Sequence, residues 1–591
     1  MKWTRLGSVW AVMLGVLAFP SFSQAQVCTP RTFNGAWNGE VTLCQNWDVD
    51  EQQRFWFTAQ GSLIIPYEWF LVLEQKGSTT PFRDGAHMDG FRYLPQRPTA
   101  LNPEGLPIGF TKDVTRRRKP YSGISKDWLG ITCAACHTNQ IEFTKAGGTT
   151  HRMLIDGGPA MADIAGLMHA LVDALVATRD DEVKFDRFAT AVLNEQGRRP
   201  SSRRKRHIKE DLDQVIEIRQ AWNNRNQGPF PYGFARLDAI GAIFNEVTTV
   251  PLDLPDNHLP ADAPVSYPFL WDTPHYDRVQ WNGSVPNKGA GALARNIGEV
   301  LGVFGGLKYS RPFGNRTSVD IKKLGELEKL ISTLQSPPWP EEFLGAIDPE
   351  KLDDGRRAFD RFCVDCHEHT KALGVTRPFK AKMMTVAEAG TDPRMANNFL
   401  KRMRNTGKLE GKPTGYLTGE RFKDPEDISN KFLGYAVTGT IVHELIFHPV
   451  RTLKAIKAGR SGDRLTSDEA REEQLTRRLF DAAPTKDSIE KFLKKDDDVP
   501  ESDPEKEACY KARSLNGIWA TAPYLHTGSV RTMRQLLLPA SERQTTFRVG
   551  SREYDPVDMG FKDEGGFELD TNLDGNKNTG HEGLDYGNEK F

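Results

Sequence analysis

The chain lacks several features that would place it quickly in a functional class. Beyond the N-terminal region no segment approaches roughly 18 consecutive apolar residues, so the sequence predicts no membrane-spanning helix in the mature chain. The formal net charge of -1 over 591 residues gives no indication of a nucleic-acid partner. Cysteine is scarce, with seven residues in all. The chemistry must therefore be sought in the few places where cysteine does occur.

Four of the cysteines lie in two copies of the pattern C-x-x-C-H, at residues 133–137 and 363–367. Two thiols at this spacing can form thioether bonds to both vinyl groups of one haem, while the adjacent His binds the iron. Chance would produce the pattern roughly 0.002 times in such a chain. A thioredoxin-like or zinc-binding C-x-x-C would not need the following His twice. We therefore predict two covalent haem c groups, attached at Cys133, Cys136, Cys363 and Cys366, with His137 and His367 as proximal ligands.

The N-terminus is typical of a bacterial export signal. Lys2 and Arg5 precede an apolar run that ends at Phe19, and Ala25 closes a small-x-small cleavage site. The apolar run is too short to act as a stop-transfer helix. We expect residues 1–25 to be a signal peptide and the mature protein to be periplasmic or secreted, where haem c is attached in bacteria.

Three cysteines remain outside the haem motifs. Cys28 and Cys44 are close enough in sequence to form a disulfide, which the oxidising periplasm would permit. Cys509 would then be a buried free thiol, unless the pairing is different. None of the three belongs to a recognisable metal-binding pattern.

The pattern of apolar residues predicts a mainly α fold with long loops and few, short strands. Helical spacing covers Asp211–Asn223 and Ala235–Val247, and a helix that includes Leu327–Leu334 ends before a proline-rich segment. An amphipathic helix over Pro349–Phe362 leads into the second C-x-x-C-H. We place the domain boundary in the proline-rich segment. This gives an N-terminal haem domain, 26–335, which begins with an irregular aromatic-rich cap, and a C-terminal domain, 345–591.

The haem motifs, the export signal and the late segment Ala522-Pro523-Tyr524-Leu525-His526-Thr527-Gly528-Ser529 resemble the dihaem cytochrome c peroxidase superfamily. Four stretches resemble its rubber oxygenase and dihaem fatty-acid dioxygenase branch: Trp56–Gln75, Trp128–Gln140, Tyr267–Gly305 and Ala520–Gly560. The resemblance implies two cytochrome c-like haem domains. It also implies that the first haem is reactive and that the second is a six-coordinate electron store.

The resemblance further implies a Trp between the haems and a distal Glu. Trp281 in Val279-Gln280-Trp281-Asn282-Gly283 is the best match for the Trp, with Trp271 as second candidate and an ordinary core Trp as the alternative. Glu299 lies near the expected offset for the Glu, which would move a proton between peroxide oxygens. Apolar residues at helical spacing around Glu299 make a surface carboxylate the alternative.

The sixth ligand of the second haem has two main candidates, His581 and His526. We favour His581, because the His that matches His526 in peroxidases lies near the haem without binding it. Met559 is a weaker choice, and His443 and His448 are expected to be helix-surface or core residues.

The segment that begins at Asp570 imitates the start of a calcium loop, but His581 stands where an EF-hand needs Glu. Calcium is therefore only a secondary cofactor candidate. The chain stops ten residues after His581 without a predicted closing helix, which leaves open whether the C-terminus is complete.

These features predict a haem oxidoreductase that activates O2 or hydrogen peroxide at the His137 haem. In the dioxygenase version, O2 attacks a carbon–carbon double bond of an apolar unsaturated substrate. The principal rival is a peroxidase that receives electrons from a small periplasmic donor protein through Trp281. A third hypothesis is a non-catalytic electron carrier, which would require both irons to be six-coordinate.

Overall fold

The computed structural model describes residues 31–32, 40–114, 123–145, 147–287, 290–310, 314–367, 380–415, 420–458 and 507–582. The predicted signal peptide and Cys28 lie outside these residues. Helix accounts for 41% of the structure and strand for 17%. The fold is therefore mixed, and the prediction of a mainly α fold is only partly right. In the part of the chain that is described, no helix is both long and apolar enough to cross a membrane.

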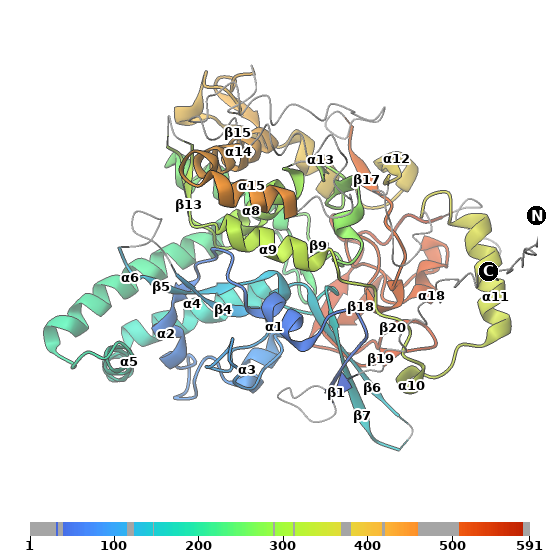
Figure 1. Cartoon of the computed structure of the whole chain (residues 1–591), viewed down its shortest axis with the longest axis horizontal. Helices are drawn as coiled ribbons and strands as arrows, with labels where there is room; N and C mark the ends of the chain where they lie inside the picture. The colour runs from blue at the N-terminus through green and yellow to red at the C-terminus, as the bar shows by residue number, and fades with distance from the viewer. Residues whose placement is uncertain are drawn as a thin grey trace, which may run out of the picture.

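Three helices form an arm at one end of the molecule, at the left of Figure 1: α4 (Ile164–Asp180), α5 (Glu182–Glu195) and α6 (Ser202–Arg225). The predicted helix at 211–223 is confirmed as part of α6. It begins nine residues earlier than predicted, because the Ser201 side chain accepts a hydrogen bond from the Arg204 amide and so caps the helix.

A second group of helices packs around one apolar core at the top of Figure 1. Its members are α7 (Ala239–Thr248), α8 (Gly291–Gly302), α9 (Ile321–Ile331), α14 (Ser429–Phe447) and α15 (Pro449–Ala458). The helix α7 starts after the predicted Ala235, since 236–237 form a strand and Asp238 caps the helix. The helix α9 ends before the proline-rich segment, as predicted.

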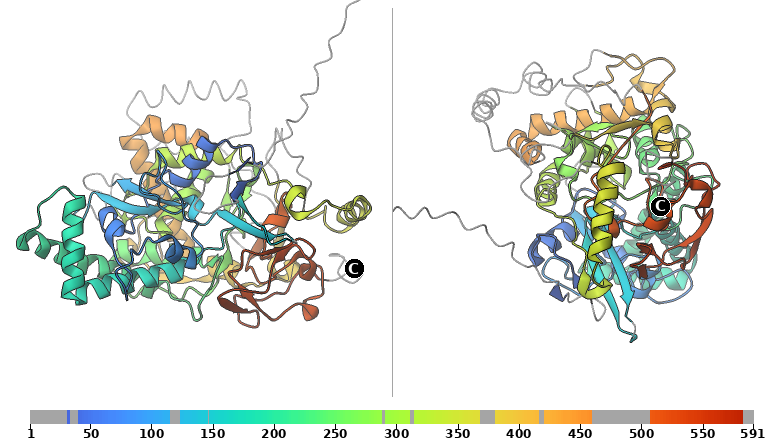
Figure 2. Two further views of the ribbon diagram at one scale, coloured as in Figure 1. Left: turned by 90° about the horizontal axis from the view of Figure 1, so that it is seen from below. Right: turned by 90° about the vertical axis from the view of Figure 1, so that its right-hand side faces the viewer.

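The predicted helix before the second C-x-x-C-H is confirmed as α11 (Pro349–Phe362), which Asp348 caps. It lies at the edge of the molecule, and none of its side chains is fully buried (Figures 1 and 2). The other helices are α1 (Val49–Phe57), α2 (Tyr67–Val72), α3 (Gly85–Gly90), α10 (Glu341–Leu344), α12 (Val386–Ala389), α13 (Arg394–Lys401) and α18 (Met533–Leu536).

Two small sheets flank the first C-x-x-C-H. One has the order β1 (Arg31–Thr32), β2 (Glu40–Thr42), β7 (Thr150–Asp156), β6 (Thr138–Thr144), with β2 parallel to β7. The other has the order β3 (Ile65–Pro66), β5 (Asp127–Ile131), β4 (Phe110–Val114). The N-terminal segment, predicted to be an irregular cap, thus supplies strands to both sheets. Pairing across some 100 residues leaves no local sequence signal, which explains why these strands were not predicted.

The remaining strands of the described residues form two-stranded antiparallel sheets. They are β8 (Arg236–Leu237), β9 (Val265–Ser266), β10 (Arg278–Val279), β11 (Val285–Pro286), β12 (Leu307–Lys308), β13 (Arg316–Thr317), β14 (Met383–Thr385), β15 (Met403–Asn405), β16 (Glu426–Ile428), β17 (Cys509–Lys511), β18 (Thr546–Val549), β19 (Tyr554–Asp555), β20 (Gly560–Phe561) and β21 (Phe567–Asp570).

One hydrophobic core joins residues from both sides of the predicted domain boundary. Trp56 and Trp271 pack in the same cluster as Trp519 and Tyr554. Both predicted domains therefore contribute to one core. The division into 26–335 and 345–591 stays a prediction. Among the other cysteines, Cys44 is disulfide-bonded. Cys509 is buried and free, as predicted.

Candidate haem sites

The first C-x-x-C-H is held rigidly between the strands β5 and β6. Cys133–Ala135 form a short 3-10 helix, and Thr132 both caps it and donates a hydrogen bond from its hydroxyl to the Trp56 carbonyl (2.9 Å). Gly109 packs so closely on the backbone of Ala135 that any side chain there would collide with it. The motif therefore has little freedom to move relative to the N-terminal segment.

Both proximal histidines are oriented by backbone carbonyls. His137 Nδ1 lies 2.8 Å from Pro268 O, and His367 Nδ1 lies 2.6 Å from Arg513 O. Because a carbonyl can only accept, each Nδ1 donates and each Nε2 keeps its lone pair. Burial lowers the pKa of His137 to about 4 and also lowers that of His367, so both rings are neutral at physiological pH. A neutral imidazole with Nδ1–H bonded to a carbonyl is the usual form of a metal-binding His.

A second imidazole faces His367. The ring of His581 lies nearly parallel to that of His367, with an interplanar angle of 19° and 6.2 Å between ring centroids. Two imidazoles that bind one metal ion from opposite sides, each at about 2 Å, have centroids about 6 Å apart. The spacing of these two rings therefore matches a single iron between them.

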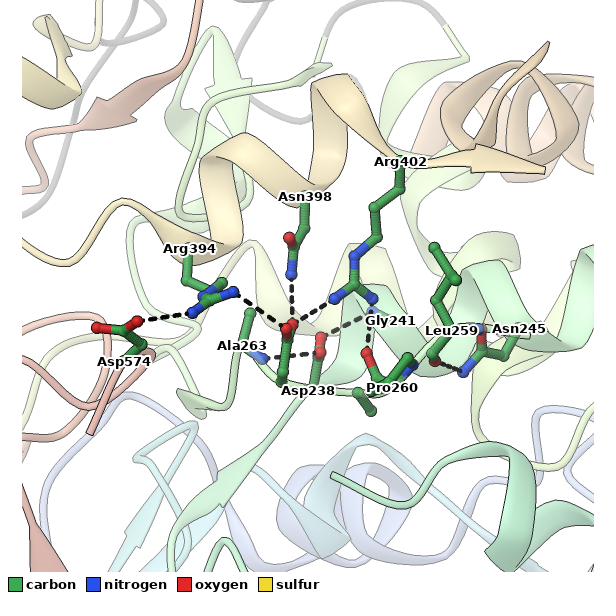
Figure 3. Close-up of polar contacts among 12 residues, drawn as sticks. Asp238, Gly241, Asn245, Leu259, Pro260, Ala263, Arg394, Asn398, Arg402 and Asp574 are labelled. Atoms are coloured by element: carbon green, nitrogen blue, oxygen red, sulfur yellow. Dashed lines mark hydrogen bonds and ion pairs between the residues drawn. The ribbon is translucent and has the colours of Figure 1, made fainter. Parts of the chain in front are cut away.

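The loop that carries His581 is anchored at several points. Asp392 accepts hydrogen bonds from the amides of Gly575 (2.8 Å) and Lys577 (3.1 Å). The ion pair between Arg394 and Asp574 (3.0 Å) ties the loop to α13 (Figure 3). His581 itself has a φ of 56°, a left-handed conformation that is uncommon for a residue with a side chain. Such backbone strain is typical of residues held in place for a function.

Arg543 fixes the end of the same loop. Its side chain is 3% exposed and donates to the carbonyls of Asn578 and His581, the latter at 3.4 Å. It also donates to the carbonyls of Leu536 and Leu538. Arg543 therefore connects the segment after α18 with the backbone of His581.

His526, the rival candidate, lies elsewhere. Its ring packs 4.2 Å from that of Tyr510 and 6.4 Å from that of Trp281, and Thr391 Oγ1 lies 3.4 Å from its Nδ1. Burial lowers its pKa to about 3. In the described residues, its Nε2 has no hydrogen-bond partner, and its ring makes no contact with that of either proximal His.

The surroundings of His137 differ from those of His367. Among the described residues no second imidazole makes a ring contact with His137; its ring neighbour is Tyr267, at 6.3 Å and 70°. Burial raises the pKa of the Cys133 and Cys136 thiols to about 12, and the Glu299 carboxylate is the next cause for both. The negative charge of Glu299 therefore acts on both thiols of the first C-x-x-C-H.

Glu299 is half-buried on α8 and is not the surface carboxylate that its apolar neighbours allowed. Burial raises its pKa, which the nearby Arg295 partly offsets. It accepts a hydrogen bond from Gln280 Nε2 (3.1 Å), and Gln280 has a left-handed φ of 68°. Arg295, one helical turn before Glu299, is paired with the buried Glu328 (2.5 Å). The spacing of four residues between Arg295 and Glu299 places both side chains on the same face of α8, and this is the sequence signal that could have revealed the polar cluster.

Trp281 and Trp271 occupy different environments. Trp281 is partly buried, donates to Ser266 O (3.1 Å) and lies with its ring 5.1 Å from the guanidinium of Arg513. Trp271 is fully buried, donates to Asn516 O (2.7 Å) and stacks on Phe269. Trp271 therefore has the character of an ordinary core Trp. Arg513, which lies against Trp281, follows a short strand and belongs to no sequence motif.

The remaining candidates have other recorded neighbours. Met559 packs against the core that contains Trp519. His443 lies on α14 beside Phe447, and His448 is the C-cap of that helix, as expected. Asp574 of the suspected calcium loop is paired with Arg394. In the described residues, no three His, Cys, Asp or Glu side chains form a metal-binding cluster.

Comparisons with known proteins agree with a haem protein. A family model described as RoxA-like, cytochrome c-like matches residues 509–548, a stretch that includes Arg513, His526 and Arg543. The uncharacterized protein y4iJ of Sinorhizobium fredii (strain NBRC 101917 / NGR234) is 31% identical to this chain, over 91% of this chain and 88% of the relative. The uncharacterized protein y4iM of the same strain is 48% identical over 52 residues, which are 9% of this chain and 12% of that protein.

Proposed function

This chain belongs to the same family as y4iJ and contains a RoxA-like cytochrome c segment, and on this premise we propose that it is a periplasmic dihaem oxidoreductase. In this proposal the haem at His137 activates O2 for the oxidation of an apolar unsaturated substrate. The haem at His367 is six-coordinate, with His581 as its second ligand, and stores electrons.

The observation that carries the proposal is the difference between the two proximal histidines. His367 has a parallel imidazole at 6.2 Å, whereas His137 has none among the described residues. An iron with two protein ligands suits electron transfer, and an iron with an open position can bind O2 or peroxide. The donor sets fit haem c, since each motif supplies two thiols and a neutral His with its Nδ1 already hydrogen-bonded.

A haem held by Cys133, Cys136 and His137 would supply the iron chemistry that activates O2 or peroxide. The protein contributes the surroundings. Pro268 O fixes the tautomer and orientation of His137. Glu299, with a raised pKa, is available to hold or release a proton, and Gln280 directs one of its oxygens. The buried pair of Arg295 and Glu328 keeps a positive charge beside Glu299.

The polar cluster around Glu299 favours a second candidate function, peroxide reduction. Proton transfer between the peroxide oxygens needs a carboxyl that can be protonated near neutral pH, and burial moves Glu299 in that direction. The electrons would come from a small periplasmic donor protein, with Trp281 beside Arg513 as a relay candidate. Oxygenation of an olefin needs no such proton shuttle.

Turnover assays on the purified holoprotein distinguish the two functions. Oxygen uptake is recorded with oleate or polyisoprene, and peroxide decay is recorded with a reduced small cytochrome. We expect oxygen uptake only when the olefin is present. Peroxide decay that depends on the donor would instead favour the peroxidase. Two low-spin haems that respond to neither substrate would leave only an electron carrier.

The variant Glu299→Gln tests the role of the carboxyl. For a peroxidase we expect kcat to fall by about 10²- to 10⁴-fold, the usual contribution of a general acid–base group. For the dioxygenase we expect a change of less than about threefold. The matched control is Glu326→Gln, since Glu326 is exposed on the neighbouring α9 and pairs only with Lys322 among the described residues. An equal loss in both variants would show that the effect is not specific to the site.

A further inference from the structure

A short chain of bonds connects the two proximal histidines. His137 Nδ1 donates to Pro268 O (2.8 Å), and the next residue, Phe269, accepts a hydrogen bond on its carbonyl from Arg513 Nη2 (2.6 Å). The carbonyl of Arg513 in turn accepts from His367 Nδ1 (2.6 Å). A single side chain therefore joins the segment that orients one His to the segment that orients the other.

The guanidinium of Arg513 is fixed in a buried position. Arg513 is 8% exposed, and its guanidinium carbon lies 3.7 Å from the centroid of the Phe269 ring and 5.1 Å from that of Trp281. Phe269 is itself stacked on Trp271, with 4.8 Å between centroids. A planar guanidinium suits such a stacked site, whereas an ammonium does not. In the described residues, Nε of Arg513 has no hydrogen-bond partner.

The side chain of Arg513 also carries a positive charge at the link between the two histidine segments. Burial lowers its pKa to about 10, so it stays protonated at neutral pH. A fixed cation favours the reduced, less positive state of a nearby haem iron, and hydrogen bonds to the proximal His tune the same potential.

We propose that Arg513 is a positioning residue that couples the two haem sites by holding the carbonyl acceptors of both proximal histidines in one hydrogen-bonded unit. This inference rests on the proposed presence of two haems, but not on the substrate. It predicts that one substitution alters the reduction potentials of both haems, although the hydrogen bond of the Arg513 side chain goes to the Phe269 carbonyl and not to a proximal imidazole.

The test uses the full holoprotein and the variants Arg513→Gln and Arg513→Lys. Haem content is measured first, so that a protein with fewer than two haems counts against the proposed function rather than against the coupling. Both potentials are then measured by spectroelectrochemical titration without substrate. We expect both potentials to fall in Arg513→Gln, and to fall less in Arg513→Lys, which keeps the charge but loses the planar fork.

The matched control is Arg404→Gln. Arg404 is also buried, but its hydrogen bonds go to Asn245 and to the Met403 carbonyl rather than to either His segment. Unchanged potentials in this variant, with both shifted in Arg513→Gln, would support the coupling. If Arg513→Gln does not load haem, the potentials of Arg513→Lys are used to test the proposal instead. Potentials equal to those of the wild type in Arg513→Lys would overturn it. A shift at only one haem in Arg513→Gln would overturn it as well.

Discussion

The substitution His581→Ala should convert one haem, and only one, from low spin to high spin. The centroids of the His367 and His581 rings are 6.2 Å apart, and the ring planes are 19° from parallel. In the proposed arrangement, removal of the second ring would leave the iron between them with one imidazole. Because the chain has two C-x-x-C-H motifs, the change should affect half of the total haem. Electron paramagnetic resonance of the oxidised protein measures this fraction directly, as the loss of a low-spin signal and the growth of a high-spin one.

A matched variant makes this prediction strict. His526→Ala removes the rival imidazole, which is buried but packs against Tyr510 instead of His367. We expect the spin state of both haems to be unchanged in this variant. If His526→Ala produced the high-spin signal and His581→Ala did not, the assignment from ring geometry would be wrong. An imidazole added to His581→Ala should restore the low-spin signal, which separates ligand loss from misfolding.

Two further predictions concern the supports of the sites. Arg543→Gln removes the cation that binds the Asn578 and His581 carbonyls. We expect partly high-spin haem and a free energy of unfolding that is lower by about 1–3 kcal/mol in denaturation experiments. A fully low-spin spectrum would contradict this. Burial raises the pKa of Asp156 to about 6, despite hydrogen bonds from Gln52 and Trp56. Between the ordinary pKa of an Asp and this raised value, the folded protein therefore keeps a proton on Asp156 that the unfolded chain has released. Stability should therefore fall by roughly 2 kcal/mol as pH rises from 4 to 6, and the thermal midpoint of Asp156→Asn should lose this dependence. An identical pH profile in both proteins would refute this.

The parts of the site that sequence predicts are those that depend on local spacing. Thiols and imidazole of each C-x-x-C-H are neighbours along the chain, and the helix that leads to Cys363 shows its amphipathic period and its Asp348 cap directly. Glu299 could be placed on a helix but not on a face, because the apolar residues around it are consistent with either side of α8. Its partner Gln280 comes from a different element, at a left-handed position that no local pattern indicates.

The parts that sequence does not predict depend on pairing between distant segments. The strand β2 pairs with β7, more than 100 residues later. With three residues β2 is too short to show a period of two, and β7 shows none because its last four residues are all buried. Arg513 and Arg543 lie in loops without motifs, and their role becomes visible only when the carbonyls they bind are in place. The preference for His581 over His526 came from a resemblance, whereas the parallel geometry of its ring is a property of the folded loop.

The asymmetry between the two proposed haem sites has its origin outside the C-x-x-C-H motifs. The two C-x-x-C-H sequences provide the same thiols and the same proximal imidazole, each bonded to a backbone carbonyl. The described segment 507–582 supplies the carbonyl for His367, the parallel ring of His581 and the loop that holds it. The His137 site instead has its Glu299 and Gln280 from the middle of the chain. If the proposed function is right, exchange of the motifs themselves should leave the roles of the two sites unchanged, because the partners of each proximal His would decide which iron keeps an open position.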